Sequence, residues 1–188
     1  MNVLITGGTG FLGGYLVRLL ASQFEVVYLL SRQGELAKFS DLKNIIYLKG
    51  DITNLEVIAL EGEERKRLLD DIDVVVHAAA LYDLSATYTA CFLQNVVGTQ
   101  NILHLISGMK NLKSFYYVST IAVGDTDTFF LDENVLPKRT SFKDSYSETK
   151  YLAEQIVREN VNAKFVTRII RPAIIIGDSQ TCLLYTSD

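Results

Sequence analysis

Two side chains that can exchange protons stand one helical turn apart near residue 150. Tyr146 and Lys150 form the pattern Tyr-x-x-x-Lys, and residues four apart in a helix lie on one face. A neighbouring ammonium favours the phenolate, so it lowers the pKa of the phenol and makes Tyr146 a usable general acid or base. Because the chain has 10 tyrosines, the pair alone is also compatible with a chance surface arrangement.

A hydroxyl group is expected beside this pair. Ser119 and Thr120 follow the apolar run 114–118, which has the character of a strand, and the segment with Tyr146 is the next expected helix. A parallel sheet would gather these groups at the carboxyl ends of its strands, where such sheets bind ligands. Thr120, with Ser119 as the adjacent alternative, could then hydrogen-bond a substrate oxygen as charge develops on it. With a hydride-donating cofactor, the predicted catalytic set Thr120, Tyr146 and Lys150 suits carbonyl reduction.

The amino-terminal stretch predicts the site for such a cofactor. An apolar run over residues 3–5 breaks into glycines and resumes as a helical pattern. Glycine permits the sharp turn and the close approach of a phosphate, and the helix N-terminus stabilises a pyrophosphate. The glycines fit both G-x-G-x-x-G and the more specific T-G-x-x-G-x-x-G, with a plain glycine-rich turn as the alternative. The candidate cofactor-binding residues here are Thr6, Gly7, Thr9, Gly10, Phe11, Leu12 and Gly13.

Two further strand ends carry candidate cofactor contacts. Arg32 follows the apolar run 25–30, where an acid would suit the ribose of NAD and an arginine suits the 2′-phosphate of NADP. NADP(H) is therefore the expected cofactor, with NAD(H) left open and a solvated loop arginine as the alternative for Arg32. Asp51 and Ile52 follow the run 45–48. Asp51 could accept a hydrogen bond from the adenine amino group or cap a helix.

The fourth expected strand lies in residues 73–80 and ends in small side chains. Ala78, Ala79 and Ala80 would let a nicotinamide ribose lie close to the backbone, whereas we expect His77 to be structural. Asn95 stands inside the helical pattern 87–107, where it is either buried with hydrogen-bonded partners or exposed.

Strands and helices alternate along the chain. Strand patterns at 3–6, 25–30, 45–48, 73–80, 114–118 and 164–170 are separated by helical patterns at 11–20, 55–69, 87–107 and 146–160. This order predicts right-handed crossovers and one α/β domain with a Rossmann-type doubly wound parallel sheet. The helix expected over 55–69 is interrupted by Gly62, and its charged run 61–67 is expected to be a solvated face.

The composition of the chain argues against several classes of partner and location. A net charge of −4 without a basic stripe gives no indication of nucleic-acid binding. Cys91 and Cys182 have neither a disulfide framework nor metal-ligand spacing, so no metal site and a reducing, cytoplasmic compartment are expected. We expect neither a signal peptide nor a membrane span. No charged and apolar leader pattern precedes the first strand, and apolar runs such as 74–76 are far shorter than the ~20 residues of a membrane span.

Several motifs in register resemble the extended short-chain dehydrogenase/reductase superfamily. The matching segments are 6–13, 50–53, 77–80, 95–99, 119–120, 146–150 and Arg171-Pro172. The resemblance implies that Thr120 is the catalytic Ser/Thr and that Asn95 orders the active-site network. It also places Asn95, Tyr146 and Lys150 among the residues that contact the cofactor. It further implies that Pro172 and the segment after it contact the nicotinamide end.

Within the superfamily, the segments 29–32, 118–124 and 171–179 look most like the thioester reductase and fatty acyl reductase branch. That resemblance implies NADPH-dependent reduction of an acyl thioester or another carbonyl substrate, with a homodimer left open. Nucleotide-sugar epimerases and dehydratases, and hydroxysteroid or dihydroflavonol-type reductases, are the enzyme alternatives. An NADP-sensing regulatory module is the non-enzyme alternative, although such modules typically lose the tyrosine or the lysine.

The carboxyl-terminal stretch departs from this resemblance. Superfamily members continue into a smaller substrate domain, so we expect residues 1–181 to be an NAD(P)-binding domain truncated before it. Residues 182–188, Cys-Leu-Leu-Tyr-Thr-Ser-Asp, resemble a translated sequencing adaptor and are expected to be a non-native tail, with a natural tail as the alternative.

Overall fold

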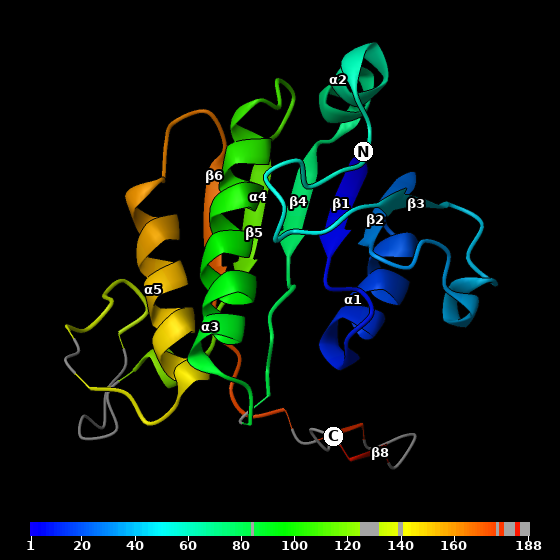
Figure 1. Ribbon diagram of the computed structural model, residues 1–188. Helices are drawn as coiled ribbons and strands as arrows, with labels where there is room; N and C mark the ends of the chain where they lie inside the picture. Colours follow the sequence, from blue (N-terminus) through cyan, green and yellow to red (C-terminus); the bar gives the residue numbers. More distant parts are fainter. Residues whose placement is uncertain (84, 125–131, 139–140, 176, 179–182, 185–188) are drawn as a thin grey trace.

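Six short strands, most of them apolar, pair into one parallel sheet in the computed structural model, which describes residues 1–83, 85–124, 132–138, 141–175, 177–178 and 183–184. The strands are β1 (Asn2–Thr6), β2 (Val26–Ser31), β3 (Ile45–Lys49), β4 (Val74–His77), β5 (Ser114–Val118) and β6 (Val166–Ile170). Their order is β3-β2-β1-β4-β5-β6, and each neighbouring pair is parallel (Figure 1). The predicted Rossmann-type doubly wound sheet is therefore confirmed, with its switch point between β1 and β4.

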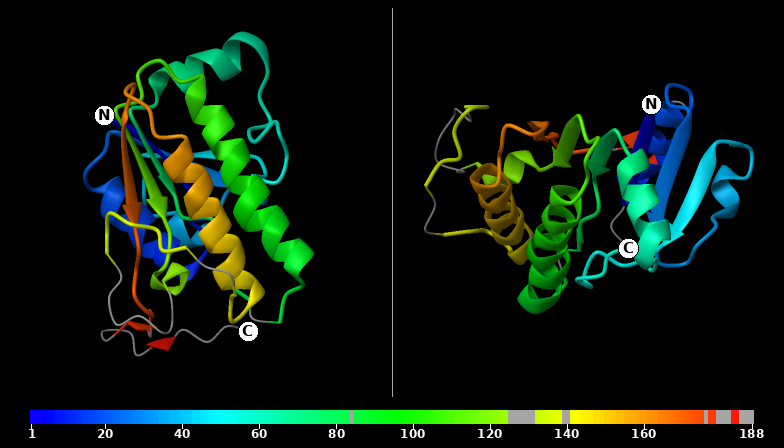
Figure 2. Two further views of the ribbon diagram at one scale, coloured as in Figure 1. Left: turned by 90° about the vertical axis from the view of Figure 1, so that its left-hand side faces the viewer. Right: turned by 90° about the horizontal axis from the view of Figure 1, so that it is seen from above.

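The connecting helices cover the two faces of the sheet. They are α1 (Phe11–Ala21), α2 (Gly62–Asp71), α3 (Tyr88–Cys91), α4 (Gly98–Ser107) and α5 (Ser145–Glu159), with 3₁₀ turns η1 (Ala37–Phe39) and η3 (Ile121–Val123). Figure 2 shows α4 and α5 side by side on one face and α1 on the other. Among the described residues, no helix is both long and apolar enough to cross a membrane.

Alternate side chains of the central strand supply two separate cores. Leu4 packs into the core under α4 and α5, together with Ile102, Ile106 and Phe115. Val3 and Ile5 point to the opposite core. Because burying one such side chain contributes about 1.5–3 kcal/mol, β1 anchors both layers and holds the turn that follows it in place.

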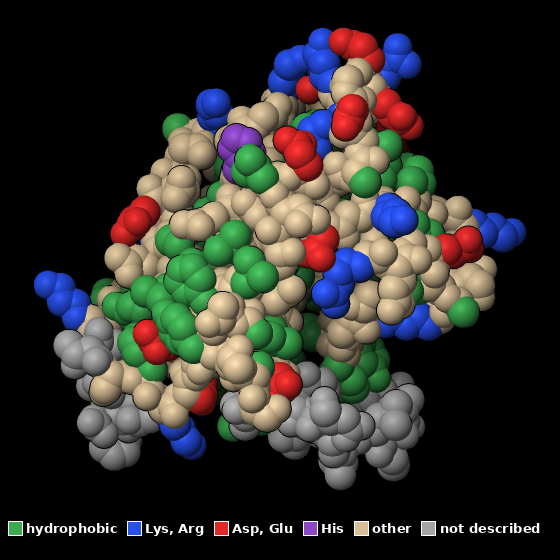
Figure 3. Space-filling view, in the orientation of Figure 1, with side chains coloured by type: hydrophobic (Ala, Val, Ile, Leu, Met, Phe, Trp, Pro, Cys, Tyr) green, Lys and Arg blue, Asp and Glu red, His purple; other side chains and the backbone are tan. Residues whose placement is uncertain are grey.

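The predicted helix over 55–69 is wrong in its first half. Val57 and Ile58 are buried in a non-helical segment whose backbone bonds to the stretch after β3: Asp51 N donates to Val57 O, and Ala59 N donates to Lys49 O. Burial of these two side chains in the core outweighs the local helical pattern. The helix α2 begins only at Gly62, whose positive φ of 58° turns the chain into it. Its charged face is solvated as predicted, and Figure 3 shows Lys, Arg, Asp and Glu side chains around it.

The predicted helix over 87–107 is continuous but not regular. It begins with Thr87, whose hydroxyl accepts from Ala90 N, and it contains a π-helical segment, η2 (Phe92–Val97), between α3 and α4. Such segments often mark functional sites, because they redirect side chains from the usual helical faces.

Other expectations fall partly outside the described residues. Residues 125–131 and 139–140 of the expected loop 124–144 lie outside them, as do residues 182 and 185–188 of the expected tail. Leu183–Leu184 (β8) of that tail pairs with Gly177–Asp178 (β7) in antiparallel fashion.

Two adjacent glycines of α1 allow a matched test of the turn. A Cβ on Gly13 would stand 2.0 Å from Gly7 O, whereas a Cβ on Gly14 would meet nothing closer than Lys38 Nζ at 3.5 Å. We expect Gly13→Ala to lower the free energy of unfolding by about 3 kcal/mol. Gly14→Ala should be neutral or raise it by up to about 1 kcal/mol, because alanine favours helices. Urea unfolding measures both, and equal effects would contradict the close packing at Gly13.

Candidate active site

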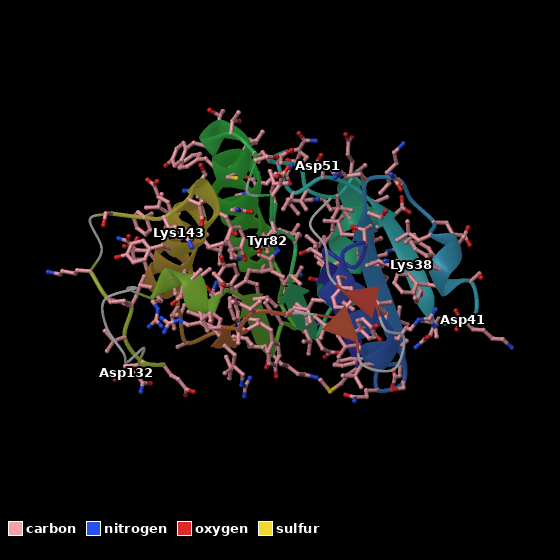
Figure 4. All side chains as sticks on the ribbon, turned by 90° about the horizontal axis from the view of Figure 1, so that it is seen from below. Lys38, Asp41, Asp51, Tyr82, Asp132 and Lys143 are labelled. Carbon is pink, nitrogen blue, oxygen red and sulfur yellow. The ribbon has the colours of Figure 1, made fainter. Side chains whose placement is uncertain are left out.

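One cleft of about 800 Å³ runs along the carboxyl ends of the strands. Figure 4 views the molecule from this side, with Tyr82 near the middle of the edge. The predicted site residues that line the cleft are Thr6, Gly7, Thr9, Gly10, Phe11, Leu12, Gly13, Arg32, Asp51, Ile52, Ala78, Ala79, Ala80, Thr120, Tyr146, Lys150 and Pro172. Of the predicted catalytic and cofactor-binding residues, Asn95 alone does not line the cleft. The fold thus brings groups from the ends of six strands into one space large enough for a dinucleotide and a substrate.

The glycine turn is shaped for close contact. Gly7 has a φ of +78°, and a Cβ there would stand 2.4 Å from the backbone N of Ala79, so both the conformation and the space require glycine. Helix α1 starts at the N-cap Gly10, which offers no side-chain cap, and its first turn carries no acid. The N–H groups at its start therefore suit an anion, and the chain fits the pyrophosphate of a dinucleotide here.

The next two strand ends differ in what their side chains do. Arg32 is exposed and lines the cleft directly after β2. Asp51 lines it after β3, but its Oδ1 accepts from Thr53 N and Thr53 Oγ1, both at 2.9 Å. Asp51 therefore stabilises a local turn, and the helix-cap alternative is wrong because α2 begins only at Gly62.

A buried chain of hydrogen bonds starts behind the glycine turn. Ala79 N donates to Thr6 Oγ1 at 3.3 Å, and Thr6 Oγ1 stands 2.6 Å from His77 Nδ1. On the other side, His77 Nε2 stands 3.1 Å from Thr99 Oγ1, which donates its own proton to Asn95 O at 2.6 Å. Because Thr99 gives its proton away, it must accept from Nε2–H, so Nδ1 accepts from Thr6.

His77 is therefore a neutral structural residue, as predicted. Complete burial, with a smaller effect of the Lys150 charge, lowers the pKa of His77 to about 3. A second proton on the ring, at Nδ1, would find no acceptor, because the Thr6 hydroxyl already donates to that nitrogen.

Asn95 continues the chain towards α5. It is 1% exposed and lies in the π-helical segment η2. Its Oδ1 accepts from Leu81 N, and its Nδ2 donates to Leu81 O and to Thr149 Oγ1. Of the two alternatives left open by the sequence, the buried and hydrogen-bonded one is confirmed. Asn95 thus lies behind the cleft wall and joins the segment after β4 to the start of α5.

The first turns of α5 carry the tyrosine and the lysine. Asp144 is the N-cap and accepts from Ser147 N at 2.7 Å, which starts the helix just before Tyr146. The Tyr146 ring lies edge-on to Tyr82, with ring centroids 4.8 Å apart. Sequence reasoning did not single out Tyr82, and only its position shortly after the three alanines of the strand end could have indicated it.

Lys150, one helical turn after the tyrosine, is buried. Its Nζ donates to Val118 O at 2.7 Å and stands 4.4 Å from the ring centroid of Tyr117. Burial lowers the pKa of Lys150 to about 7, and the carboxylate of Glu154 opposes this shift. The lysine therefore changes charge near neutral pH, the range in which acid–base groups are most useful.

The two hydroxyls after β5 have different surroundings. Ser119 is buried, and its Oγ donates to Glu154 Oε2 at 2.6 Å. Thr120 lines the cleft as Ser119 does, but it is half-buried, and its Oγ1 accepts from Ala122 N at the start of η3. The commitment of Ser119 to Glu154 favours Thr120 over Ser119 as the group that meets a substrate.

The comparisons with known proteins agree with this architecture. A family model described as Male sterility protein, an NAD-binding domain, matches residues 5–188. The chain belongs to the male sterility protein family. The terminal R domain from the myxalamid PKS-NRPS pathway superposes with a TM-score of 0.78 at 28% identity, covering 100% of this chain and 52% of that one.

Curated relatives of this family member include two kinds of oxidoreductase. A 3-beta-hydroxysteroid dehydrogenase from Mycolicibacterium neoaurum is 34% identical over 94% of this chain and 48% of its own length. The fatty acyl-CoA reductase wat from Drosophila melanogaster is 28% identical over 93% of this chain and 43% of its own length. The chain therefore spans about half the length of the curated relatives it matches. The resemblance to extended short-chain dehydrogenases/reductases of the acyl and thioester reductase type is confirmed.

The two histidines allow a test of the buried chain of hydrogen bonds. In the unfolded chain His77 has a pKa near 6.5, so between pH 6.5 and 3 only the unfolded state binds its proton, and stability falls as the pH falls. We expect the free energy of unfolding to drop by roughly 2 kcal/mol from pH 7 to pH 5. Urea titrations should show that His77→Gln loses this slope and that His104→Gln, at an exposed position, keeps it. An unchanged slope in His77→Gln would contradict the assignment.

Proposed function

We propose that this chain carries the cofactor site and the catalytic groups of an NADP-dependent reductase that acts on an acyl thioester or a related carbonyl compound. The observation that supports this most is the meeting of Thr120, Tyr146 and Lys150 with the glycine turn in one cleft. Each group stands at the end of a different strand or at the start of a helix, where a doubly wound sheet binds its ligands.

The residues divide into cofactor and substrate contacts. The N–H groups at the start of α1 would hold the pyrophosphate, Arg32 the 2′-phosphate, and Lys150 with Ala78–Ala80 the nicotinamide ribose. A bound nicotinamide dinucleotide would supply the hydride. Thr120 donates a hydrogen bond to the substrate oxygen as negative charge grows on it, and Tyr146 gives that oxygen its proton.

The charge of Lys150 assists Tyr146. An ammonium near the phenol stabilises the phenolate that remains after proton transfer, so the transfer is easier. Because the pKa of Lys150 is held near 7 by burial, the proposed assistance is strongest at neutral and slightly acidic pH.

Part of the cleft lining suits an apolar substrate. Ile121, Ala173, Ile174 and Ile175 line the cleft together with Tyr82. Ile174 is 81% exposed, so an acyl chain that packed against it would remove apolar surface from water.

A second candidate is oxidation of a hydroxysteroid. The hydroxysteroid dehydrogenase relative is 34% identical, against 28% for the fatty acyl-CoA reductase. The same acid–base groups and the same apolar wall would serve both reactions, so substrate assays must separate them.

The proposal is tested with the protein expressed from the complete reading frame that contains these residues. Oxidation of NADPH is followed with a long-chain acyl thioester, and in parallel reactions with a 3β-hydroxysteroid plus NAD⁺ and with a nucleotide-sugar. Thioester-dependent oxidation of NADPH supports the reductase. Steroid oxidation without thioester turnover supports the second candidate, and conversion of the sugar alone would overturn both.

The proton donor can be tested by removing one oxygen. Tyr146→Phe should lower kcat for reduction by about 10²- to 10⁴-fold and change the Kd of NADPH far less, because proton transfer requires the phenol oxygen whereas the cofactor has many other expected contacts. The matched control is Tyr151→Phe on the same helix, whose ring packs against Phe142. Full activity of Tyr146→Phe would overturn the assignment.

The cofactor preference can be tested at the end of β2. We expect Arg32→Ala to raise the Kd of NADPH by about 10- to 100-fold, because a charge-assisted hydrogen bond contributes about 1.5–3 kcal/mol. The Kd of NADH should change by less than about twofold, since NADH lacks the 2′-phosphate. Arg67→Ala, at an exposed position of α2, serves as the control. An equal loss for both cofactors would contradict the role of Arg32.

A further inference from the structure

A completely buried carboxylate lies behind the cleft, one helical turn after Lys150 on α5. Glu154 Oε2 accepts from Ser119 Oγ at 2.6 Å and from Arg171 Nε at 3.1 Å. Its Oε1 accepts from Arg158 Nε at 2.8 Å and from Arg171 Nη2 at 2.6 Å. Burial alone would raise the pKa of Glu154, but the hydrogen bonds from Arg171, Ser119 and Arg158 outweigh it and hold the pKa below its usual value.

The partners of Glu154 adjoin the groups that face the cleft. Ser119 directly precedes Thr120, and Arg171 directly precedes Pro172. The two segments are also bonded to each other, because Ser119 N donates to Ile170 O at 2.7 Å and Ile121 N donates to Pro172 O at 3.1 Å. A shift of the carboxylate would therefore move these two cleft-lining segments together.

The two arginines extend this arrangement to a third segment. Arg171 donates to the carbonyls of Asp132 and Val135, and Arg158 donates to those of Glu133 and Asn134, all at 2.9–3.2 Å. Asp132, labelled in Figure 4, lies at the outer margin of this edge. The carbonyls of residues 132–135 thus accept hydrogen bonds from the same two guanidinium groups that bond to Glu154.

We propose that Glu154 is a positioning residue of the active site: its carboxylate holds Ser119 and Arg171, and thereby sets the place of Thr120 relative to Lys150. The proposal rests on the proposed function of Thr120, Tyr146 and Lys150. A buried ion pair often stabilises a fold no more than apolar side chains of similar size would. The positioning role gives a reason for the chain to have the carboxylate at this place.

The same carboxylate acts on Lys150 by charge. The titratable groups around Lys150 are His77 from β4, Tyr117 from β5 and Glu154 from α5, with Arg171 behind Glu154. Tyr146 precedes Lys150 by one helical turn on α5. His77 is neutral, and burial first of all raises the pKa of Tyr117, which keeps that side chain neutral too. The negative charge of Glu154 therefore helps Lys150 keep its proton, and without it Arg171 and Arg158 would repel the ammonium.

The test compares Glu154→Gln with Glu159→Gln in the complete protein. Glu159 is exposed on the same helix and bonds only locally, to Gln155, among the contacts of the described residues. We expect Glu154→Gln to lower kcat by about 10- to 100-fold with KM within about threefold, because misplacing a reacting group by an ångström costs on the order of 100-fold. The alkaline limb of the kcat profile should move to lower pH by about one unit, since an opposite charge is lost. Glu159→Gln should match the unchanged protein.

A gentler variant covers the case in which Glu154→Gln does not fold. Ser119→Ala keeps the carboxylate and both arginines, and it should lower kcat several-fold without moving the pH profile. Wild-type kcat in Ser119→Ala, or a folded Glu154→Gln with the rate and pH profile of Glu159→Gln, would overturn the proposal.

Hydrogen exchange separates this proposal from the proposed function. If the unchanged protein reduces none of the substrates, the proposed function fails. Hydrogen exchange in peptides covering residues 132–138 and 171–175 then still tests whether Glu154 anchors these segments. Faster exchange there in Glu154→Gln, relative to Glu159→Gln, supports anchoring by the carboxylate. Equal exchange in the two variants overturns it.

Discussion

The approach of two backbones at the switch point of the sheet is the constraint on which the site depends. Gly7 stands so close to Ala78 and Ala79 that no side chain fits between them. This contact brings the end of β1 against the end of β4, with Thr6 bonded to His77 directly beneath it. The glycine turn before α1 and the small-residue wall after β4 are therefore two sides of a single contact.

Behind that contact, the interior is polar in a specific order. Thr6, His77, Thr99 and Asn95 form a continuous chain of hydrogen bonds that reaches Thr149 on α5. Each buried donor in this chain finds an acceptor, which avoids the cost of an unpaired polar group. The π-helical segment η2 places Asn95 in this chain, at the point where a regular helix would present a different face. The glycine turn and the start of α5 are thus coupled through the core as well as across the cleft.

Further along α5, the interior contains two side chains of opposite charge. Lys150 and Glu154 are both buried, but they are stabilised differently: the lysine by a carbonyl and a ring face, the glutamate by two arginines and a serine. The contrast leaves the lysine with a lowered pKa and the glutamate ionised. One helix thereby carries a group that can change charge near neutrality and a group that cannot.

Much of this molecule could be predicted from the sequence, because its signals are local. Apolar runs separated by helical periodicity determined the sheet and its strands, and the glycine spacing determined the turn before α1. The Tyr146 and Lys150 spacing determined that both lie on one helix. The extent of the helix near Gly62 was not predictable, because the burial of Val57 and Ile58 against distant residues outweighed a local pattern. The contacts of Ser119 and Glu154 were not predictable either, because their partners are far away in the chain. Only the tertiary structure brings Ser119 and Arg171 to Glu154, and residues 132–135 to the arginines.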